Sequence, residues 1–418
     1  MKRTTLFILA TMVASAAYAG PLTSTRVKTI DVSTYFTAAN TNFANGRNGG
    51  FTGGIAFDGT NAYVSGWRGT TDSDGRTGVL KINDVVGTHS FSTGLGLQLQ
   101  TRGASRMSKL VRTGNSLYFG YGAGESSSAS NSGDNDLTST ATNYGLRKLD
   151  LSGSNDLAFS PRVSGADTYN VVTPGEFQGL ALGVAGARID AYDYDSNNNE
   201  MLGFDFFKTK IYRVDASTGA FKGTYDIQGD ALSGTQADTW RDMDYDPATK
   251  TLYTRASVIT TVASRANRAS VESFQLNTST GVFERKANLF QQGAAENATS
   301  KVAFFNSSIF GSIVAINDTA TKTVKVLNAS TGALMMEVNG SENGGTAFSH
   351  FFLTTTFGVG ANGKTYMMIA DSASTSNPTG GAYGDRVHVY EVVPEPGTMI
   401  ALGAGIAGIL ARRKKAAK

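Results

Sequence analysis

The chain has 418 residues, of which 49 are Gly, 7 are Pro and 17% are charged, and it contains no Cys. The lack of Cys excludes thiol catalysis and thiolate metal sites, while the high Gly content is typical of a turn-rich all-β protein. Seven of the 37 basic and one of the 34 acidic side chains lie in residues 1–19 and 394–418, which leaves 30 basic and 33 acidic side chains between them. This mildly acidic body gives no support for nucleic-acid binding.

The first 19 residues have the three parts of a secretory signal peptide. Lys2 and Arg3 form the basic start, residues 6–13 form the apolar centre, and Ala17 and Ala19 are the small residues of an A-x-A cleavage site. We expect export through the Sec translocon and cleavage by signal peptidase after Ala19. A buried N-terminal helix is the alternative interpretation of this apolar run.

An apolar strand, a polar turn and a second strand recur along residues 20–393. The turns lie near residues 58, 113, 195, 246, 306 and 361. Asx and Gly residues supply the turn conformations, and alternating apolar residues on both sides indicate strands. The longest interval holds the Ser-, Asn- and Gly-rich residues 122–143, which we interpret as an inserted loop.

A second hairpin signal, Ser-Thr-Gly, follows the first at residues 217–219, 279–281 and 330–332. Two hairpins per unit predict four strands per unit. A period of about 50–60 residues then predicts an all-β, β-propeller-like fold with about six four-stranded blades, seven being the alternative count. Stacked β-sandwiches and an irregular β-solenoid remain open as other architectures.

Two strands near the ends of the body are predicted to pair. Residues 26–32 read as an orphan strand near the start of the body, and residues 386–392 read as the strand that ends the last unit. Pairing between them would close a ring of sheets and leave no open sheet edge.

Asp193, Asp195 and Asn197 alternate in the manner of oxygen ligands in a calcium loop. The sixth and twelfth positions of that loop lack the Gly and Glu that the template needs. Asp193-Tyr194-Asp195 also matches residues 244–246 at the repeat interval, which favours a structural turn over calcium. No other metal or cofactor is predicted.

The sequence predicts no catalytic residues. His89, His350 and His388 are scattered, and there is no nucleophile elbow or phosphate-binding loop. Trp240, with Arg241, Asp242 and Asp244, could line a carbohydrate platform, although a Trp buried at a blade junction accounts for the same residues. We therefore expect a non-enzymatic protein, and keep a secreted polysaccharide hydrolase or lyase on the propeller scaffold as the alternative.

The last 25 residues contain three consecutive signals. Pro394, Glu395 and Pro396 precede an apolar segment, residues 398–411, and a basic cluster follows, comprising Arg412, Arg413, Lys414 and Lys415. Fourteen apolar residues fall short of the roughly 20 that a transmembrane helix needs. The basic cluster favours a cytoplasmic location for the end of the chain, so we expect a temporary anchor in the inner membrane.

Residues 394–418 resemble the PEP-CTERM protein-sorting signal in motif, order and terminal position. The resemblance is limited to these 25 residues. It implies recognition and removal of the tail by an exosortase, a transpeptidase-like membrane enzyme of Gram-negative bacteria. It also implies a link to exopolysaccharide and biofilm genes. We expect a protein of the cell envelope or extracellular matrix with a binding or scaffolding role and exopolysaccharide as a candidate partner, against the alternative of a plain tail anchor.

Overall fold

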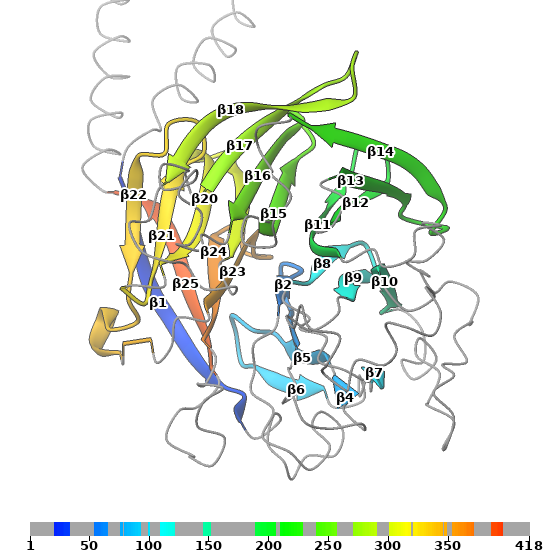
Figure 1. The fold of residues 1–418 in the computed structure, drawn as a ribbon. Coiled ribbons are helices and arrows are strands. Elements are labelled where there is room, and N and C mark those ends of the chain that lie inside the picture. Colours follow the sequence, from blue (N-terminus) through cyan, green and yellow to red (C-terminus); the bar gives the residue numbers. More distant parts are fainter. Residues whose placement is uncertain are drawn as a thin grey trace, which may run out of the picture.

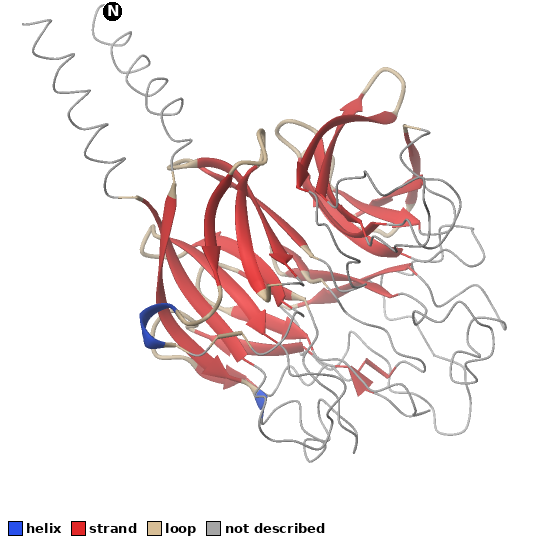
Figure 2. Ribbon diagram, turned by 60° about the vertical axis from the view of Figure 1, so that its left-hand side comes forward, coloured by secondary structure: helices blue, strands red, loops and turns tan. Residues whose placement is uncertain are grey.

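The described part of the chain in this computed structural model is built almost entirely of β-strands (Figures 1 and 2). The structure describes residues 21–33, 54–65, 76–77, 79–92, 99–100, 109–121, 145–151, 189–205, 210–228, 240–256, 271–290, 301–318, 321–345, 347–348, 353–371 and 386–395. The predicted signal peptide, inserted loop, apolar tail and basic cluster lie outside these residues. Within them, no helix is both long and apolar enough to cross a membrane. The prediction of an all-β fold is confirmed.

The strands form successive antiparallel meanders. The first unit contains β2 (Ile55–Phe57), β3 (Ala62–Ser65), β5 (Val79–Asn83) and β6 (Ser90–Ser92), beside a small pair made of β4 (Arg76–Thr77) and β7 (Leu99–Gln100). The second has three described strands, namely β8 (Val111–Thr113), β9 (Ser116–Tyr121) and β10 (Gly145–Asp150).

The third and fourth units join into one eight-stranded sheet. The third consists of β11 (Ile189–Asp195), β12 (Glu200–Asp205), β13 (Lys210–Asp215) and β14 (Phe221–Ile227). The fourth consists of β15 (Trp240–Asp246), β16 (Thr251–Ala256), β17 (Val271–Asn277) and β18 (Val282–Phe290). A short parallel pairing of β14 with β18 makes the join, with Asp226 opposite Val282.

The fifth and sixth units complete the series. The fifth consists of β19 (Val302–Ser307), β20 (Gly311–Asp318), β21 (Thr323–Asn328) and β22 (Leu334–Val338). The sixth takes β23 (Leu353–Val359), β24 (Thr365–Asp371) and β25 (Arg386–Pro394) from the end of the chain and β1 (Leu22–Asp31) from its beginning.

The pairing of the two terminal strands is confirmed. β1 runs antiparallel to β25, with Asp31 opposite Arg386 and Leu22 opposite Pro394. A 3₁₀ helix, η6 (Glu342–Gly344), follows β22 and holds this strand pair in place. Arg26 donates a hydrogen bond to the carbonyl oxygen of Gly340 at 2.8 Å, and the Tyr390 hydroxyl donates to the Glu342 carboxylate at 3.1 Å.

The first strands of the units contact one another in cyclic order. β2 contacts β8, β8 contacts β11, β11 contacts β15, β15 contacts β19, β19 contacts β23, and β23 contacts β2. Apolar clusters fill the spaces between successive units; Phe310, Ile313 and Met367, for example, belong to one cluster that joins the fifth and sixth. Sheets packed in a ring around their first strands are the arrangement of a propeller-like fold.

Antiparallel alternation places the tight turns at one end of this ring, which we call the turn end. Here each first strand turns into the second, at residues 58–61, 114–115, 196–199, 247–250, 308–310 and 360–364, in line with the predicted turns. The third and fourth strands are joined at the same end, at residues 84–89, 216–220, 278–281 and 329–333. We call the opposite end, where first strands begin, the loop end.

Candidate functional site

The sorting motif begins inside the strand pair that closes the ring. Pro394 is the last residue of β25 and lies opposite Leu22, and the Glu395 N–H donates to the Pro21 carbonyl oxygen at 3.1 Å. The motif therefore starts without a linker at the turn end, beside the first described residue of the chain. Pro396, Arg412, Arg413, Lys414 and Lys415 lie outside the described residues, as do Ala17 and Ala19 of the predicted cleavage site.

The three candidate calcium ligands each have a hydrogen-bonding role. Asp195 accepts from the Asn197 N–H at 3.0 Å and from the Asn198 side-chain amide at 2.7 Å, which closes its own turn. Asn197 donates from its side chain to the Pro247 carbonyl oxygen at 2.6 Å, linking the turns of two units. Calcium coordination at Asp193, Asp195 and Asn197 would have to replace hydrogen bonds that these side chains already make. Calcium binding there stays a prediction. No group of three His, Asp or Glu side chains in the described ranges is placed to hold a metal ion.

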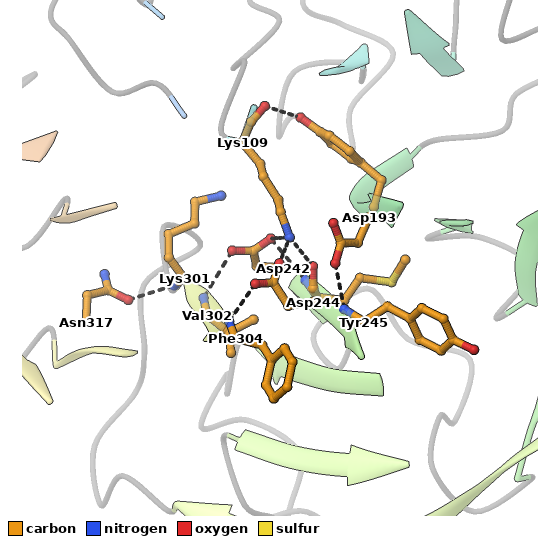
Figure 3. A network of polar contacts seen from close by, with 11 residues as sticks. Lys109, Asp193, Asp242, Asp244, Tyr245, Lys301, Val302, Phe304 and Asn317 are labelled. Atoms are coloured by element: carbon orange, nitrogen blue, oxygen red, sulfur yellow. Dashed lines mark hydrogen bonds and ion pairs between the residues drawn. The ribbon is translucent and has the colours of Figure 1, made fainter. Parts of the chain in front are cut away.

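A polar network crosses the middle of the ring and links three first strands (Figure 3). The Asp193 carboxylate on β11 accepts the Tyr245 N–H of β15 at 2.6 Å, and the Asp244 carboxylate on β15 accepts the Phe304 N–H of β19 at 2.6 Å. Asp242 accepts the Val302 N–H at 3.0 Å. Because first strands of different units do not form ladders with each other, these carboxylates satisfy backbone donors that would otherwise be buried without partners.

Lys109 brings a positive charge to this network from the second unit. It lies just before β8, and its ammonium group contacts the Asp244 carboxylate and the Met243 carbonyl oxygen and lies 3.8 Å from the Asp242 carboxylate. The side chains of Lys109, Asp242 and Asp244 are only 12%, 2% and 14% exposed. The Lys109 carbonyl oxygen in turn accepts a hydrogen bond from the Tyr192 hydroxyl.

Burial raises the pKa of the Asp193 carboxyl above its ordinary range, although the nearby Lys109 charge and the Tyr245 N–H oppose the shift. The carboxyl is thus easier to protonate than a solvated one. A carboxyl group of this kind, beside a lysine and two other carboxylates, is the feature of this network closest to acid–base chemistry.

The network continues toward the loop end through buried groups of the fifth unit. The Lys301 N–H donates to the Asn317 side-chain oxygen at 2.6 Å, and Arg255 donates to the Asn317 carbonyl oxygen at 2.9 Å. Lys301, Arg255 and Asn317 are all buried. This part of the network fastens the start of β19 to the ends of β16 and β20.

The sequence anticipated only part of this arrangement. Of the suggested carbohydrate platform, the side chains of Trp240 and Arg241 lie outside the description, while Asp242 and Asp244 act as acceptors between strands. The equivalence of Asp193 and Asp244 in the repeat was the signal for their shared role. Lys109 was missed, because nothing in its local sequence marks a side chain that crosses the ring.

A histidine–carboxylate pair lies in the ring-closing sheet. His388 on β25 has its Nδ1 3.0 Å from the Thr29 hydroxyl of β1 and its Nε2 3.5 Å from the Asp371 carboxylate of β24. The His388 and Asp371 side chains are 2% and 1% exposed. This deeply buried pair joins three strands of one sheet.

Comparison with known proteins identifies the C-terminal segment. Residues 392–415 match the PEP-CTERM protein-sorting motif. No match was found among curated proteins. The chain is similar to solved auxiliary nutrient binding proteins from Bacteroides thetaiotaomicron (14% identity, TM-score 0.48, covering 82% of this chain and 70% of that one) and Bacteroides ovatus (13%, 0.47, 90% and 77%). It is also similar to the β-propeller domain of Cps50 (Swd1) from Myceliophteria thermophila (10%, 0.39, 82% and 96%). Scores this low carry no argument about function.

The strand order and the sorting motif together define an exported, all-β, propeller-like protein. The PEP-CTERM motif implies processing by an exosortase and delivery to the cell envelope or the extracellular space.

Proposed function

We propose that this protein is a closed six-bladed β-propeller that serves as a non-enzymatic binding or scaffolding component of the cell envelope or extracellular matrix, linked to exopolysaccharide. The observation that carries the proposal is the direct fusion of the sorting motif to the ring-closing strand, with Pro394 opposite Leu22. The same strand, β25, therefore closes the ring and carries the start of the sorting motif.

The blade count rests on the cyclic order of the first strands. Five units have four described strands and one has three, and the contacts of β2 with both β8 and β23 close the cycle. A closed ring has no long open sheet edge at which copies could add strands. It suits a protein that remains folded outside the cell without disulfides.

Transient anchoring follows from the tail. Residues 398–411 enter the inner membrane and the basic cluster holds them there until the exosortase acts. The turn end then faces the bilayer, and the loop end faces away from it. Ligands such as exopolysaccharide meet the loop end, where the longer connections between strands begin.

The non-enzymatic assignment is supported by how the central carboxylates are used. Asp193, Asp242 and Asp244 each accept a backbone N–H from the next first strand. A carboxylate fixed in this way is poorly placed to exchange protons with a substrate. Calcium binding at Asp193, Asp195 and Asn197 remains a secondary proposal.

The alternative is a polysaccharide hydrolase or lyase, and one observation favours it. Three carboxylates and Lys109 gather in the middle of the ring, and burial raises the pKa of Asp193. A raised carboxyl pKa is what a general acid requires.

The test is to incubate the chain with bacterial and plant polysaccharides, with and without calcium, and to measure binding and reducing-end release together. We expect binding without release. Release that Asp193→Asn abolishes, while the control Asp226→Asn on the exposed face of β14 does not, would establish the enzyme. Loss of residues 1–19 and of the segment after Val393, seen by intact-mass analysis of protein from its host, checks the processing.

A further inference from the structure

Several of the large hydrophobic side chains that the described residues expose lie at the turn end. Six such side chains are between 37% and 55% exposed, and five lie at this end, namely Phe221, Ile309, Leu334, Val359 and Val393. The sixth, Val27, lies in the middle of β1. Single exposed hydrophobic residues are ordinary. Four of these five, however, lie in the fifth and sixth units, where the sorting tail leaves the ring, and an exposed apolar patch there indicates a contact surface.

The position of each residue in its strand fixes this placement. Phe221 and Leu334 are the first residues of β14 and β22, which both begin at the turn end. Val359 is the last residue of β23, and Val393 is the next to last of β25. Ile309 lies in the turn between β19 and β20. These positions belong to the third, fifth and sixth units.

The sorting tail leaves the ring at the same end. Glu395 is exposed and bonded to Pro21. Only Pro396 and Gly397 separate it from the apolar segment that begins at residue 398. Two residues span at most about 7 Å, so an inserted tail holds the turn end against the bilayer surface.

We propose that the turn end is a membrane-contact surface, whose exposed apolar side chains enter the headgroup region of the bilayer that receives the tail. The inference rests on the proposed anchoring by the tail. Apolar side chains that are held at an interface lose contact with water there, which stabilises the contact. The contact orients the loop end away from the membrane while the tail is in place.

Charge makes a small contribution to this contact. Lys222 and Lys364 lie at the turn end and are each ion-paired, to Asp215 at 3.2 Å and to Glu391 at 2.8 Å, so their charges are partly neutralised toward anionic lipid headgroups. Lys250, exposed in the turn between β15 and β16, adds one further positive charge at this end. The contact should therefore persist at about 1 M salt, where the Debye length is about 3 Å and charge–charge attraction is screened.

The lack of Cys allows single labels to test the surface. The chain without its signal peptide but with its tail is reconstituted into vesicles of phosphatidylethanolamine and phosphatidylglycerol. An environment-sensitive fluorophore is attached to Leu334→Cys or Val359→Cys. The matched control is Lys322→Cys, an exposed site at the loop-end side of β21, in the same sheet as Leu334. Brominated lipids then serve as quenchers.

Because interfacial side chains enter only about 5–10 Å, bromine is placed at shallow acyl positions, and we expect at least a roughly twofold loss of emission at 334 and 359 and little at 322. If the protein floats with the vesicles in a density gradient but quenching is equal at all three sites, the inference is wrong and the anchoring by the tail stands. If the protein does not float with the vesicles, both the inference and the anchoring are refuted. If the fluorophore at 334 reports an apolar environment without quenching by brominated lipid, and copies of the chain cross-link, the surface serves self-association and the inference is wrong.

Discussion

Replacing Lys109 by Met tests whether the central network holds the ring together. Met keeps an apolar side chain of similar length and removes the charge. The change leaves Asp242 and Asp244, 2% and 14% exposed, without the ammonium group that contacts one and lies 3.8 Å from the other. It also removes the hydrogen bond to the Met243 carbonyl oxygen.

The magnitude follows from burial. At an effective dielectric constant of about 20, two unit charges about 4 Å apart interact by roughly 4 kcal/mol. Removing one partner of a buried pair costs about 3–5 kcal/mol, because the other charge stays buried. We expect Lys109→Met to lower the free energy of unfolding by about 3–5 kcal/mol.

Urea unfolding of residues 20–395, followed by circular dichroism, measures this loss. Lys364→Met is the control, since Lys364 is 53% exposed in its pair with Glu391, and it should leave the midpoint unchanged. Adding Asp244→Asn to Lys109→Met should recover part of the loss, because it removes an uncompensated charge. A loss below about 1 kcal/mol, the range of surface pairs, would refute a structural role for this network.

Three further changes test other parts of the structure. Burial raises the pKa of Asp193 above 3.8, so the charged form of this carboxyl destabilises the fold. Asp193→Asn should therefore gain stability relative to the unmodified chain as pH rises through the raised pKa. Urea unfolding measured across pH tests this, and the opposite trend would contradict it. Thr23→Cys with Val393→Cys, which are opposed in the β1–β25 ladder, should form a disulfide detectable by mass and raise stability by about 2–4 kcal/mol, whereas Thr23→Cys with Arg386→Cys should not form one. Gly332→Ala should cost about 2–4 kcal/mol, because φ is +73° and its new Cβ would lie 2.3 Å from the Leu289 carbonyl oxygen; Gly114→Ala, with φ +54° and open space, should cost about 1–2 kcal/mol, and equal losses in thermal or urea unfolding would show that the close approach is unimportant.

The sequence could locate the turns because their chemistry is local. The Asp195 side chain accepts the N–H two residues ahead, and the Asn328 side chain accepts the N–H groups two and three residues ahead, from Ser330 and Thr331. Asx and Gly residues therefore mark these turns wherever they occur. The spacing of the turns predicted repeated units, and the orphan strand near the start of the body predicted the pairing with the last strand, which the structure contains.

The repeat could not predict which of its equivalent residues are buried. Phe221 and Phe283 follow the same Ser-Thr-Gly turn, yet Phe221 is 44% exposed and Phe283 is fully buried. The difference arises because Phe283 packs edge-on against Tyr225 of β14, the strand of the third unit that pairs with β18, and against Tyr245 of β15. The burial of this Phe side chain depends on a contact with the neighbouring unit, so the local sequence pattern cannot predict it.

The central network depends even more on tertiary structure. The sequence determined that Asp193 and Asp244 occupy equivalent places in first strands, and that the sorting tail follows the last strand directly. Only the closed ring brought Lys109 to Asp244 across 135 residues and placed each carboxylate at the N–H of the next first strand. The physical reason is that turn bonds satisfy nearby backbone groups within one hairpin, whereas the exposed edges of first strands acquire partners only when separate sheets pack side by side.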